Sequence, residues 1–171
     1  RYVFFTPDGR RLLSAGLDGA KLLDIATGRE LAVFKGHTDI SWAAAFSRDG
    51  RILATGSDDK TVRIWDVTTG NELHILKDEF AVMHVSISPD GRTLATVATN
   101  RSEVAANRAI RGDWRIKLWN VPTGNELFTI KAHKSWIFMI EFSPDGKLLA
   151  TASHDGLVKL WDVVTGRELF T

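Results

Sequence analysis

Two short sequence patterns recur four times each along the chain, in strict alternation. The first is a Ser/Thr-X-Asp-Gly tetrapeptide, at residues 6–9, 47–50, 88–91 and 143–146. The second is a Thr-Gly-X-Glu-Leu pentapeptide, at residues 27–31, 69–73, 123–127 and 165–169. The glycines of successive pentapeptides are 42, 54 and 42 residues apart. A period of this length predicts a repeat protein in which each unit is one supersecondary element.

Short segments of strand length lie between these patterns. In the second unit they span residues 42–46, 52–55, 62–65 and 72–76. Each is rich in β-branched or aromatic residues and is bounded by an Asp-Gly, Asp-Asp or Thr-Gly turn, whereas helical periodicity of similar strength is absent. Glycine suits such turns because it accepts a positive φ angle without steric cost. The pattern predicts an all-β chain with four antiparallel strands per unit.

A third recurrence makes the repeat specific. The third strand of each unit is expected to end in a Trp-Asp dipeptide or a variant of it, and two units have a histidine before their first strand. Unit by unit these residues are Leu23-Asp24, His37 with Trp65-Asp66, Trp119-Asn120, and His133 with Trp161-Asp162. With these residues in register, the chain resembles the WD-repeat (WD40) β-propeller family over essentially its whole length. Its compact turn motifs are similar to those of prokaryotic WD arrays. The resemblance implies four propeller blades, at approximately residues 1–34, 35–77, 78–131 and 132–171.

The resemblance also implies a hydrogen-bonded tetrad of Trp, Thr, His and Asp side chains within a blade. The two complete sets are Trp65, Thr55, His37 and Asp59, and Trp161, Thr151, His133 and Asp155. Without the resemblance, a Thr, a His and an Asp could be taken for a nucleophile, a base and an acid. An enzyme needs one active site, whereas a structural device is copied with its blade, so the repetition favours a structural role. We therefore expect no catalytic residue.

The other two units keep only part of this tetrad. Unit 3 has Thr96, Asp113 and Trp119, but Asp78-Glu79 stands where the histidine is expected. Unit 1 has Ser14 and Asp18, with Leu23 in place of the tryptophan. Such degradation is easier to understand for a structural device than for a single active site.

The sequence predicts neither a metal site nor a cofactor site. The chain has no cysteine, which excludes disulfides and thiolate ligands. The Asp-Gly turns lack the dense alternating acids of a calcium loop, and they are better explained as turns. His74, His84 and His154 occur singly, without metal-ligand spacing.

Charge and hydropathy argue against two classes of partner. The formal net charge of +1 gives no general affinity for nucleic acid or anionic membranes. No apolar run approaches the roughly 18 residues that cross a bilayer, and residues 1–5 do not resemble a signal peptide. We expect proteins or peptides as partners, and the cytoplasm as the compartment.

A partner-binding face is predicted from two features. Unit 3 contains an insert of about residues 100–112, which carries Arg101, Arg108 and Arg111 and is followed by Trp114. In the WD-repeat family that connection opens on the same face as the His-bearing loops, where partner-contacting residues often occur at the starts of the innermost strands and before the turn aspartates. The matching positions here are Ile40, Trp42, Asp58, Met83, Trp136, Phe138 and His154. Core packing of the aromatic residues, and an insert without a partner, remain alternatives.

Four blades would leave an apolar blade face exposed at each end, which is unfavourable. We therefore expect part of a larger ring, typically of seven blades, or a ring completed by a second copy. The predicted function is a non-catalytic scaffold for protein–protein interaction. The alternative is a regulatory or sensor portion of an enzyme, for example a kinase or nucleotide hydrolase, whose catalytic domain lies outside these residues. Peptide or nucleic-acid binding through the insert is a third and weaker hypothesis, because three arginines do not form a basic stripe.

Overall fold

The computed structural model describes residues 2–16, 19–99 and 114–171, and every regular element within them is a β-strand. These strands form four sheets of four antiparallel strands each, in which sequence neighbours pair. The predicted all-β class, with four strands per unit, is therefore confirmed. We call the sheets blades 1 to 4. The insert expected at residues 100–112 lies outside the described residues.

The strand bounds follow the repeat closely. Blade 1 contains β1 (Tyr2–Phe5), β2 (Arg11–Gly16), β3 (Gly19–Asp24) and β4 (Glu30–Phe34). Blade 2 contains β5 (Ser41–Phe46), β6 (Ile52–Ser57), β7 (Thr61–Asp66) and β8 (Glu72–Lys77). Blade 3 contains β9 (Ala81–Ile87), β10 (Thr93–Thr99), β11 (Trp114–Asn120) and β12 (Glu126–His133). Blade 4 contains β13 (Ile137–Phe142), β14 (Leu148–Ser153), β15 (Val158–Asp162) and β16 (Glu168–Phe170).

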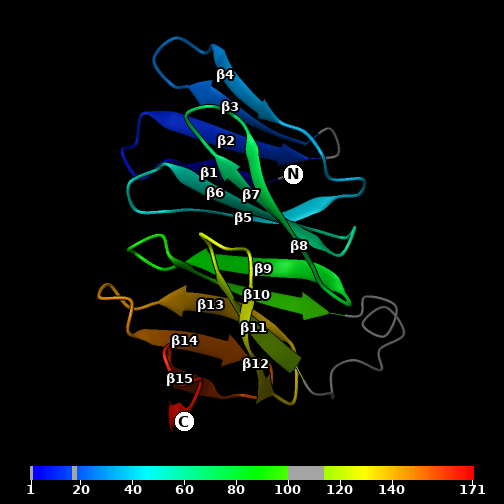
Figure 1. The fold of residues 1–171 in the computed structure, drawn as a ribbon, viewed down its shortest axis with the longest axis vertical. Coiled ribbons are helices and arrows are strands. Elements are labelled where there is room, and N and C mark those ends of the chain that lie inside the picture. Colours follow the sequence, from blue (N-terminus) through cyan, green and yellow to red (C-terminus); the bar gives the residue numbers. More distant parts are fainter. Residues whose placement is uncertain (1, 17–18, 100–113) are drawn as a thin grey trace.

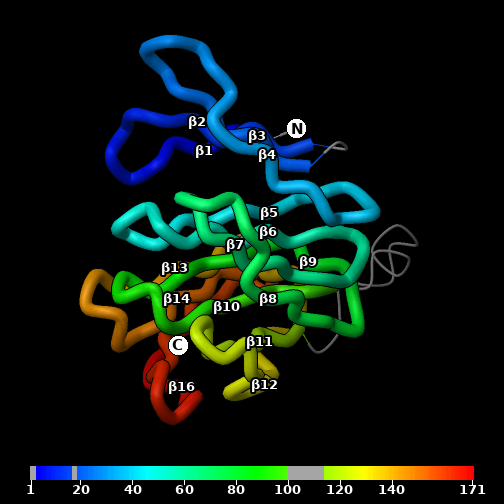
Figure 2. The backbone as a smooth tube through the Cα atoms, turned by 45° about the horizontal axis from the view of Figure 1, so that its top comes forward, coloured from blue at the N-terminus to red at the C-terminus, as the bar shows by residue number. Residues whose placement is uncertain are grey.

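The blades follow one another in chain order, from the blue blade 1 to the orange and red blade 4 (Figure 1). Their first strands lie next to one another, because β1 contacts β5, β5 contacts β9, and β9 contacts β13. In the rotated view of Figure 2, blade 1 lies at the top and blade 2 below it, and blades 3 and 4 overlap beneath them. The first strand of each blade is therefore the innermost one, and the blades fan outward from it.

Each hydrophobic core lies between two successive blades. In blade 2, Leu53 and Trp65 belong to the core between blades 1 and 2, whereas Ala54 and Ile64 belong to the core between blades 2 and 3. The division follows from the pleat, because successive side chains of a strand point to opposite faces of the sheet. We call the side of a blade that faces the preceding blade its backward face, and the other side its forward face. A third core joins blades 3 and 4.

The tetrapeptide closes the turn between the first and second strands of each blade. In blade 2, Ser47 Oγ donates to Asp49 Oδ1 over 2.6 Å, and the same carboxylate oxygen accepts the backbone N–H of Arg51. Gly50 completes the turn at φ 69°, where an L side chain would be strained. The hydrogen bond from Ser47, followed by that from Arg51, lowers the pKa of Asp49. The aspartate is thus committed to its own turn, as the turn interpretation requires.

The aspartate of the Trp-Asp dipeptide closes the turn on the same side of the blade. Asp66 Oδ1 accepts the backbone N–H groups of Thr68 and Thr69, each over 2.8 Å. Asn120 and Asp162 make the equivalent bond in blades 3 and 4. The opposite side of the molecule carries residues 35–40, 58–60, 78–80, 134–136 and 154–157, which we call the loop face.

Candidate functional site

The predicted tetrad of blade 2 forms a continuous chain of hydrogen bonds. Trp65 Nε1 donates to Thr55 Oγ1 over 2.9 Å, and Thr55 Oγ1 lies 2.8 Å from His37 Nε2. His37 Nδ1 lies 2.9 Å from Asp59 Oδ2. Thr61 Oγ1 donates to the other carboxylate oxygen over 2.6 Å. The chain runs from the buried third strand to the loop face, and joins residues up to 28 positions apart.

Blade 4 repeats this geometry. Trp161 Nε1 donates to Thr151 Oγ1 over 3.0 Å, and the hydroxyl lies 2.7 Å from His133 Nε2. His133 Nδ1 lies 3.0 Å from Asp155 Oδ2. Leu157 occupies the position of Thr61, and its backbone N–H donates to the Asp155 carboxylate as that of Thr61 does to Asp59. Because leucine has no hydroxyl, the second bond that Thr61 makes has no equivalent in blade 4.

A neutral imidazole satisfies the hydrogen-bonding groups of both tetrads. Its Nδ1–H donates to the aspartate, and its Nε2 accepts the threonine hydroxyl, which in turn accepts the indole N–H. Burial lowers the pKa of His37 and of His133, against the opposing effect of the hydrogen bonds and charges of Asp59 and Asp155. Both histidines are therefore held in the uncharged form near neutral pH.

The same geometry bears on whether Thr55 or Thr151 could act as a catalytic nucleophile. Thr55 and Thr151 are each only 1% exposed, and both hydroxyls already bond an indole and an imidazole. A nucleophile must reach a substrate atom, with its base within hydrogen-bond distance. Neither threonine offers its hydroxyl to solvent in this structure.

In blade 3, which lacks the histidine, the residue at that position forms an ion pair. Trp119 Nε1 still donates to Thr96 Oγ1 over 3.0 Å. Asp78, at the histidine position, lies 3.3 Å from Lys117 Nζ and its side chain is buried. Sequence reasoning missed this pair, although an acid in the loop and a lysine on the third strand were both visible. Asp113, and Asp18 of blade 1, lie outside the described residues.

Three aromatic side chains gather on the loop face of blade 4. His154 stacks on Trp136 with ring centroids 5.2 Å apart and an interplanar angle of 8°. Phe138 meets the same imidazole edge-on, at 5.4 Å and 78°. Trp136 is 39% exposed and Phe138 46% exposed, and His154 is exposed as well. We call Trp136, Phe138 and His154 the aromatic cluster.

The tetrad of blade 4 holds the loops that carry this cluster. Asp155, next to His154, accepts the backbone N–H of Lys134 over 3.1 Å. The backbone N–H of His154 donates to the carbonyl of Trp136 over 2.9 Å. Because the carboxylate is fixed in turn by His133, the buried chain sets the position of the exposed rings.

The other predicted positions of the loop face are less exposed. In blade 2, Asp58 donates its backbone N–H to the carbonyl of Ile40, which matches the bond between His154 and Trp136. Ile40, Trp42, Asp58 and Met83 are all partly buried. These side chains form a less exposed part of the face than the aromatic cluster of blade 4, although Phe80, in the loop before β9, is 37% exposed.

The structure corrects the expectation for Trp114. Its side chain is only 5% exposed, and it belongs to the hydrophobic core between blades 3 and 4. A side chain at the start of a third strand points into the blade interface here, and proximity to a basic insert in the sequence was misleading. Arg101, Arg108 and Arg111, expected on the same face, lie outside the described residues.

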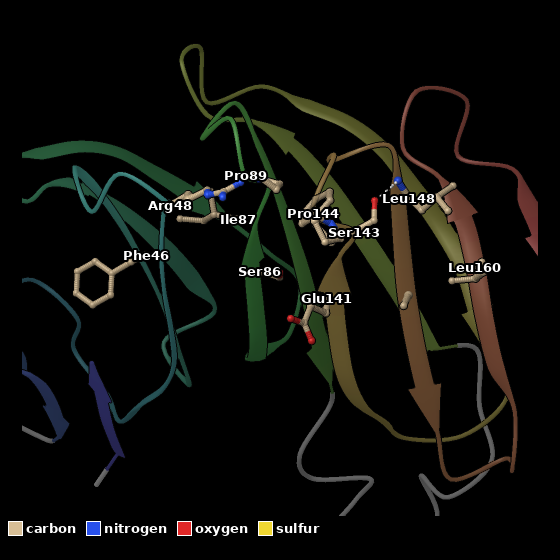
Figure 3. Close-up of a pocket in the computed structure, with 12 residues that line it drawn as sticks. Phe46, Arg48, Ser86, Ile87, Pro89, Glu141, Ser143, Pro144, Leu148 and Leu160 are labelled. Carbon is tan, nitrogen blue, oxygen red and sulfur yellow. Dashed lines mark hydrogen bonds between the residues drawn. The ribbon is translucent and has the colours of Figure 1, made fainter. Parts of the chain in front are cut away.

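A cavity of about 600 Å³ opens on the other side of the molecule, near the Asp-Gly turns of blades 2, 3 and 4 (Figure 3). Its charged lining residues are Arg48 and Glu141. Arg48 stands where the other three tetrapeptides have proline, and Glu141 stands where blades 2 and 3 have Ala45 and Ser86. Leu148, Ala150 and Leu160 extend the lining onto the forward face of blade 4. Sequence reasoning did not predict this cavity.

Across residues 2–16, 19–99 and 114–171, no three His, Asp or Glu side chains come close enough together to hold a metal ion. Within the same ranges, no helix has the length and apolar character needed to cross a membrane.

Comparison with known families and proteins agrees with this architecture. The family model for the WD40 repeat, described as "WD domain, G-beta repeat", matches residues 28–66, 70–120 and 124–162. Each matched stretch begins at or next to the glycine of one pentapeptide and ends at the Trp-Asp or Trp-Asn dipeptide of the next unit.

Three curated relatives illustrate the similarity. Serine-threonine kinase receptor-associated protein of Gallus gallus is 31% identical, over 90% of this chain and 52% of the relative. Lissencephaly-1 homolog of Caenorhabditis briggsae is 32% identical, over 75% of this chain and 30% of the relative. Eukaryotic translation initiation factor 3 subunit I of Pyricularia oryzae is 35% identical, over 58% of this chain and 29% of the relative. The chain thus spans about half, or less, of the length of these relatives.

Proposed function

Since this chain belongs to the WD40 repeat family, we propose that it is a protein-interaction module that binds a partner through the loop face of blade 4. The observation that carries the proposal is the aromatic cluster, in which His154 lies between Trp136 and Phe138 with all three rings reaching the surface. In this proposal the chain is a scaffold, and the tetrads are structural rather than catalytic.

The exposed position of these rings favours binding. A Trp and a Phe on a surface leave apolar area in contact with water, and covering that area lowers the free energy by roughly 25 cal/mol per Å². Aromatic residues are favoured anchors in protein interfaces, because they contribute a large area with few rotatable bonds. The bonds from Asp155 to Lys134 and from His154 to Trp136 hold the cluster in place before binding. Less conformational entropy is then lost when a partner docks.

The kind of partner follows from the same side chains. Flat apolar rings suit a peptide segment that presents an aromatic, proline or long aliphatic side chain. The net charge of +1 supports a protein partner over a nucleic acid. Two of the relatives have names, "receptor-associated protein" and "subunit", that describe association with other proteins. These names support the class of function and not the identity of a partner.

The test uses peptides selected from a random library against the wild-type chain. We expect the substitution Trp136→Glu to weaken binding of the selected peptides at least tenfold, because it replaces the indole ring of the cluster with a charge. The matched control is Leu127→Glu, which puts the same charge at a similarly exposed apolar residue of β12. Equal affinity for wild type and Trp136→Glu, with both folded, would show that the cluster is not the binding site.

A further inference from the structure

Blades 2 and 4 tie their loops to their tetrads by the same set of hydrogen bonds. In blade 4, the Asp155 carboxylate accepts the backbone N–H groups of Lys134 and Leu157, each over 3.1 Å. In blade 2, the Asp59 carboxylate accepts the two equivalent N–H groups over 3.0 and 2.9 Å. In both blades a serine hydroxyl also donates to a carbonyl of the loop before the first strand, over 3.1 Å. Blade 2 therefore serves as an internal reference for blade 4.

The loops of blade 2 have two further bonds. Thr61 Oγ1 donates to Asp59 Oδ1 over 2.6 Å, and the side chain of Asp39 accepts the next backbone N–H over 2.7 Å. In blade 4, Leu157 has no hydroxyl and Ser135 stands at the position of Asp39. Ser135 Oγ is buried and has no hydrogen-bond partner among the residues that the structure describes. The loops of blade 4 are thus held by fewer bonds, and they depend more on their tetrad.

These less strongly tied loops are the ones that carry the aromatic cluster. Trp136 lies in the first loop, and His154 lies in the second, directly before Asp155. Their rings stack 5.2 Å apart, and the His154 N–H donates to the Trp136 carbonyl over 2.9 Å. Blade 2 has the partly buried Ile40 and Asp58 at these two positions. A shift of one loop of blade 4 against the other would therefore separate the rings.

We propose that His133 and Asp155 are positioning residues for the aromatic cluster, so that this buried pair controls how tightly the exposed rings bind a peptide. This role rests on the proposed function, which makes the cluster the binding site. A peptide that covers rings from two loops needs both loops in one arrangement, and any freedom that the loops keep is lost on binding. Binding groups are held precisely when a second set of residues fixes them. In blade 4 the Asp155 carboxylate, itself fixed by His133, bonds the backbone of both loops.

The first test replaces this carboxylate with an amide of the same size. Asp155 accepts three N–H groups, from His133 Nδ1 and from the backbone of Lys134 and Leu157. An amide has an NH₂ group in place of one oxygen, so Asp155→Asn loses at least one of these bonds. We expect Asp155→Asn to weaken binding of the selected peptides about tenfold, measured by titration calorimetry at a temperature where the variant is folded.

The matched control makes the same change in blade 2. Asp59 holds the equivalent loops, but these loops do not carry the cluster. Asp59→Asn should therefore lower the free energy of unfolding comparably, while it changes peptide affinity by less than about twofold. The comparison separates a loss of binding geometry from a general loss of stability.

A second test adds a bond instead of removing one. Leu157→Thr places a hydroxyl where Thr61 has one in blade 2, and Leu157→Val has the same shape without the hydroxyl. We expect Leu157→Thr to bind the selected peptides about twofold more tightly than Leu157→Val. Hydrogen exchange of the Lys134 and His154 backbone amides in the free chain should also be slower in Leu157→Thr. Neither variant removes a member of the tetrad, so this comparison holds even where Asp155→Asn does not fold.

Trp136→Glu distinguishes the failure of this role from the failure of the proposed function. If Trp136→Glu leaves peptide affinity unchanged, the cluster is not the binding site and both proposals fail. If Trp136→Glu weakens binding but Asp155→Asn binds as the wild type does, the positioning role alone is overturned. Equal losses in Asp155→Asn and Asp59→Asn also overturn it, because affinity then follows overall stability. Equal affinities of Leu157→Thr and Leu157→Val have the same consequence.

Discussion

The indole nitrogen of Trp161 donates a hydrogen bond to Thr151 Oγ1 over 3.0 Å, at a position where the threonine also faces the imidazole of His133. One hydroxyl thereby satisfies two buried groups that water cannot reach. The same relationship joins Trp65 to Thr55 in blade 2 and Trp119 to Thr96 in blade 3. The threonine is the centre of the arrangement, since it remains in blade 3 where the histidine has been lost.

Removing that hydroxyl should destabilise the fold markedly. Thr151→Val keeps the shape of the side chain but leaves the Trp161 N–H without an acceptor and the His133 Nε2 without a donor. We expect a loss of about 3 kcal/mol in the free energy of unfolding, measured by urea denaturation. Thr129→Val, at an exposed threonine of β12, is the control and should change stability by about 0.5 kcal/mol or less. A similar small effect at Thr151 would contradict the role assigned to the chain of hydrogen bonds.

Lys60 should be replaceable with a gain in stability. It sits in the turn between β6 and β7 at φ 67°, where the equivalent residue of blade 4 is Gly156 at φ 84°. A left-handed backbone costs a non-glycine residue about 1 kcal/mol, so Lys60→Gly should raise the free energy of unfolding by up to that amount. The reciprocal change Gly156→Lys should lower it similarly. If both variants unfold at the wild-type denaturant concentration, the turn is not strained.

The stability of the fold should decrease as the pH falls below about 7. The pKa values of His37 and His133 lie below 6.5 in the folded chain because of burial, whereas unfolded histidine titrates near 6.5. The unfolded state therefore binds more protons in the interval below 6.5. Their contribution is complete above that pH and is lost as the pH falls toward the folded values. Asp59 and Asp155 act in the same direction at lower pH, since hydrogen bonds outweigh burial and lower their pKa values below 3.8.

Urea denaturation at several pH values between about 5 and 8 measures this dependence. The double variant with His37→Gln and His133→Gln should be less stable at neutral pH, but its stability should change less with pH. His84, whose pKa burial also lowers, accounts for part of the slope that remains. A slope identical to that of the wild type would show that the two tetrad histidines do not cause the pH dependence.

Two tryptophans that lie 22 positions apart should respond differently to substitution. Trp114 is 5% exposed in the core between blades 3 and 4, so Trp114→Ala should cost about 3–5 kcal/mol. Trp136→Ala, on the loop face, should change the free energy of unfolding by about 1 kcal/mol or less. Thermal and urea unfolding of the two variants provide the comparison. A large loss at Trp136 would mean that the ring belongs to the core and is not available to a partner.

Much of this architecture can be predicted from the sequence because the repeat supplies its own alignment. The matching patterns alone place Thr55, His37 and Asp59 in positions equivalent to Thr151, His133 and Asp155. The contact of Lys117 with Asp78 cannot be predicted in this way, because blades 2 and 4 have His37 and His133 at the position of Asp78 and so offer no equivalent pair to align. The expectation for Trp114 was wrong for a related reason. Trp114 begins β11, and a position beside a loop in the sequence does not determine which face of a strand a side chain occupies.

Hydrogen exchange of the chain with and without a selected peptide tests the central claim most directly. The account predicts that bound peptide slows exchange of backbone amides in residues 134–138 and 152–157, which carry and flank the aromatic cluster. Exchange in the turns at residues 47–51 and 143–147, on the opposite side, should not change. Protection confined to those turns, with none around Trp136 and His154, would contradict the assignment of the loop face as the binding surface.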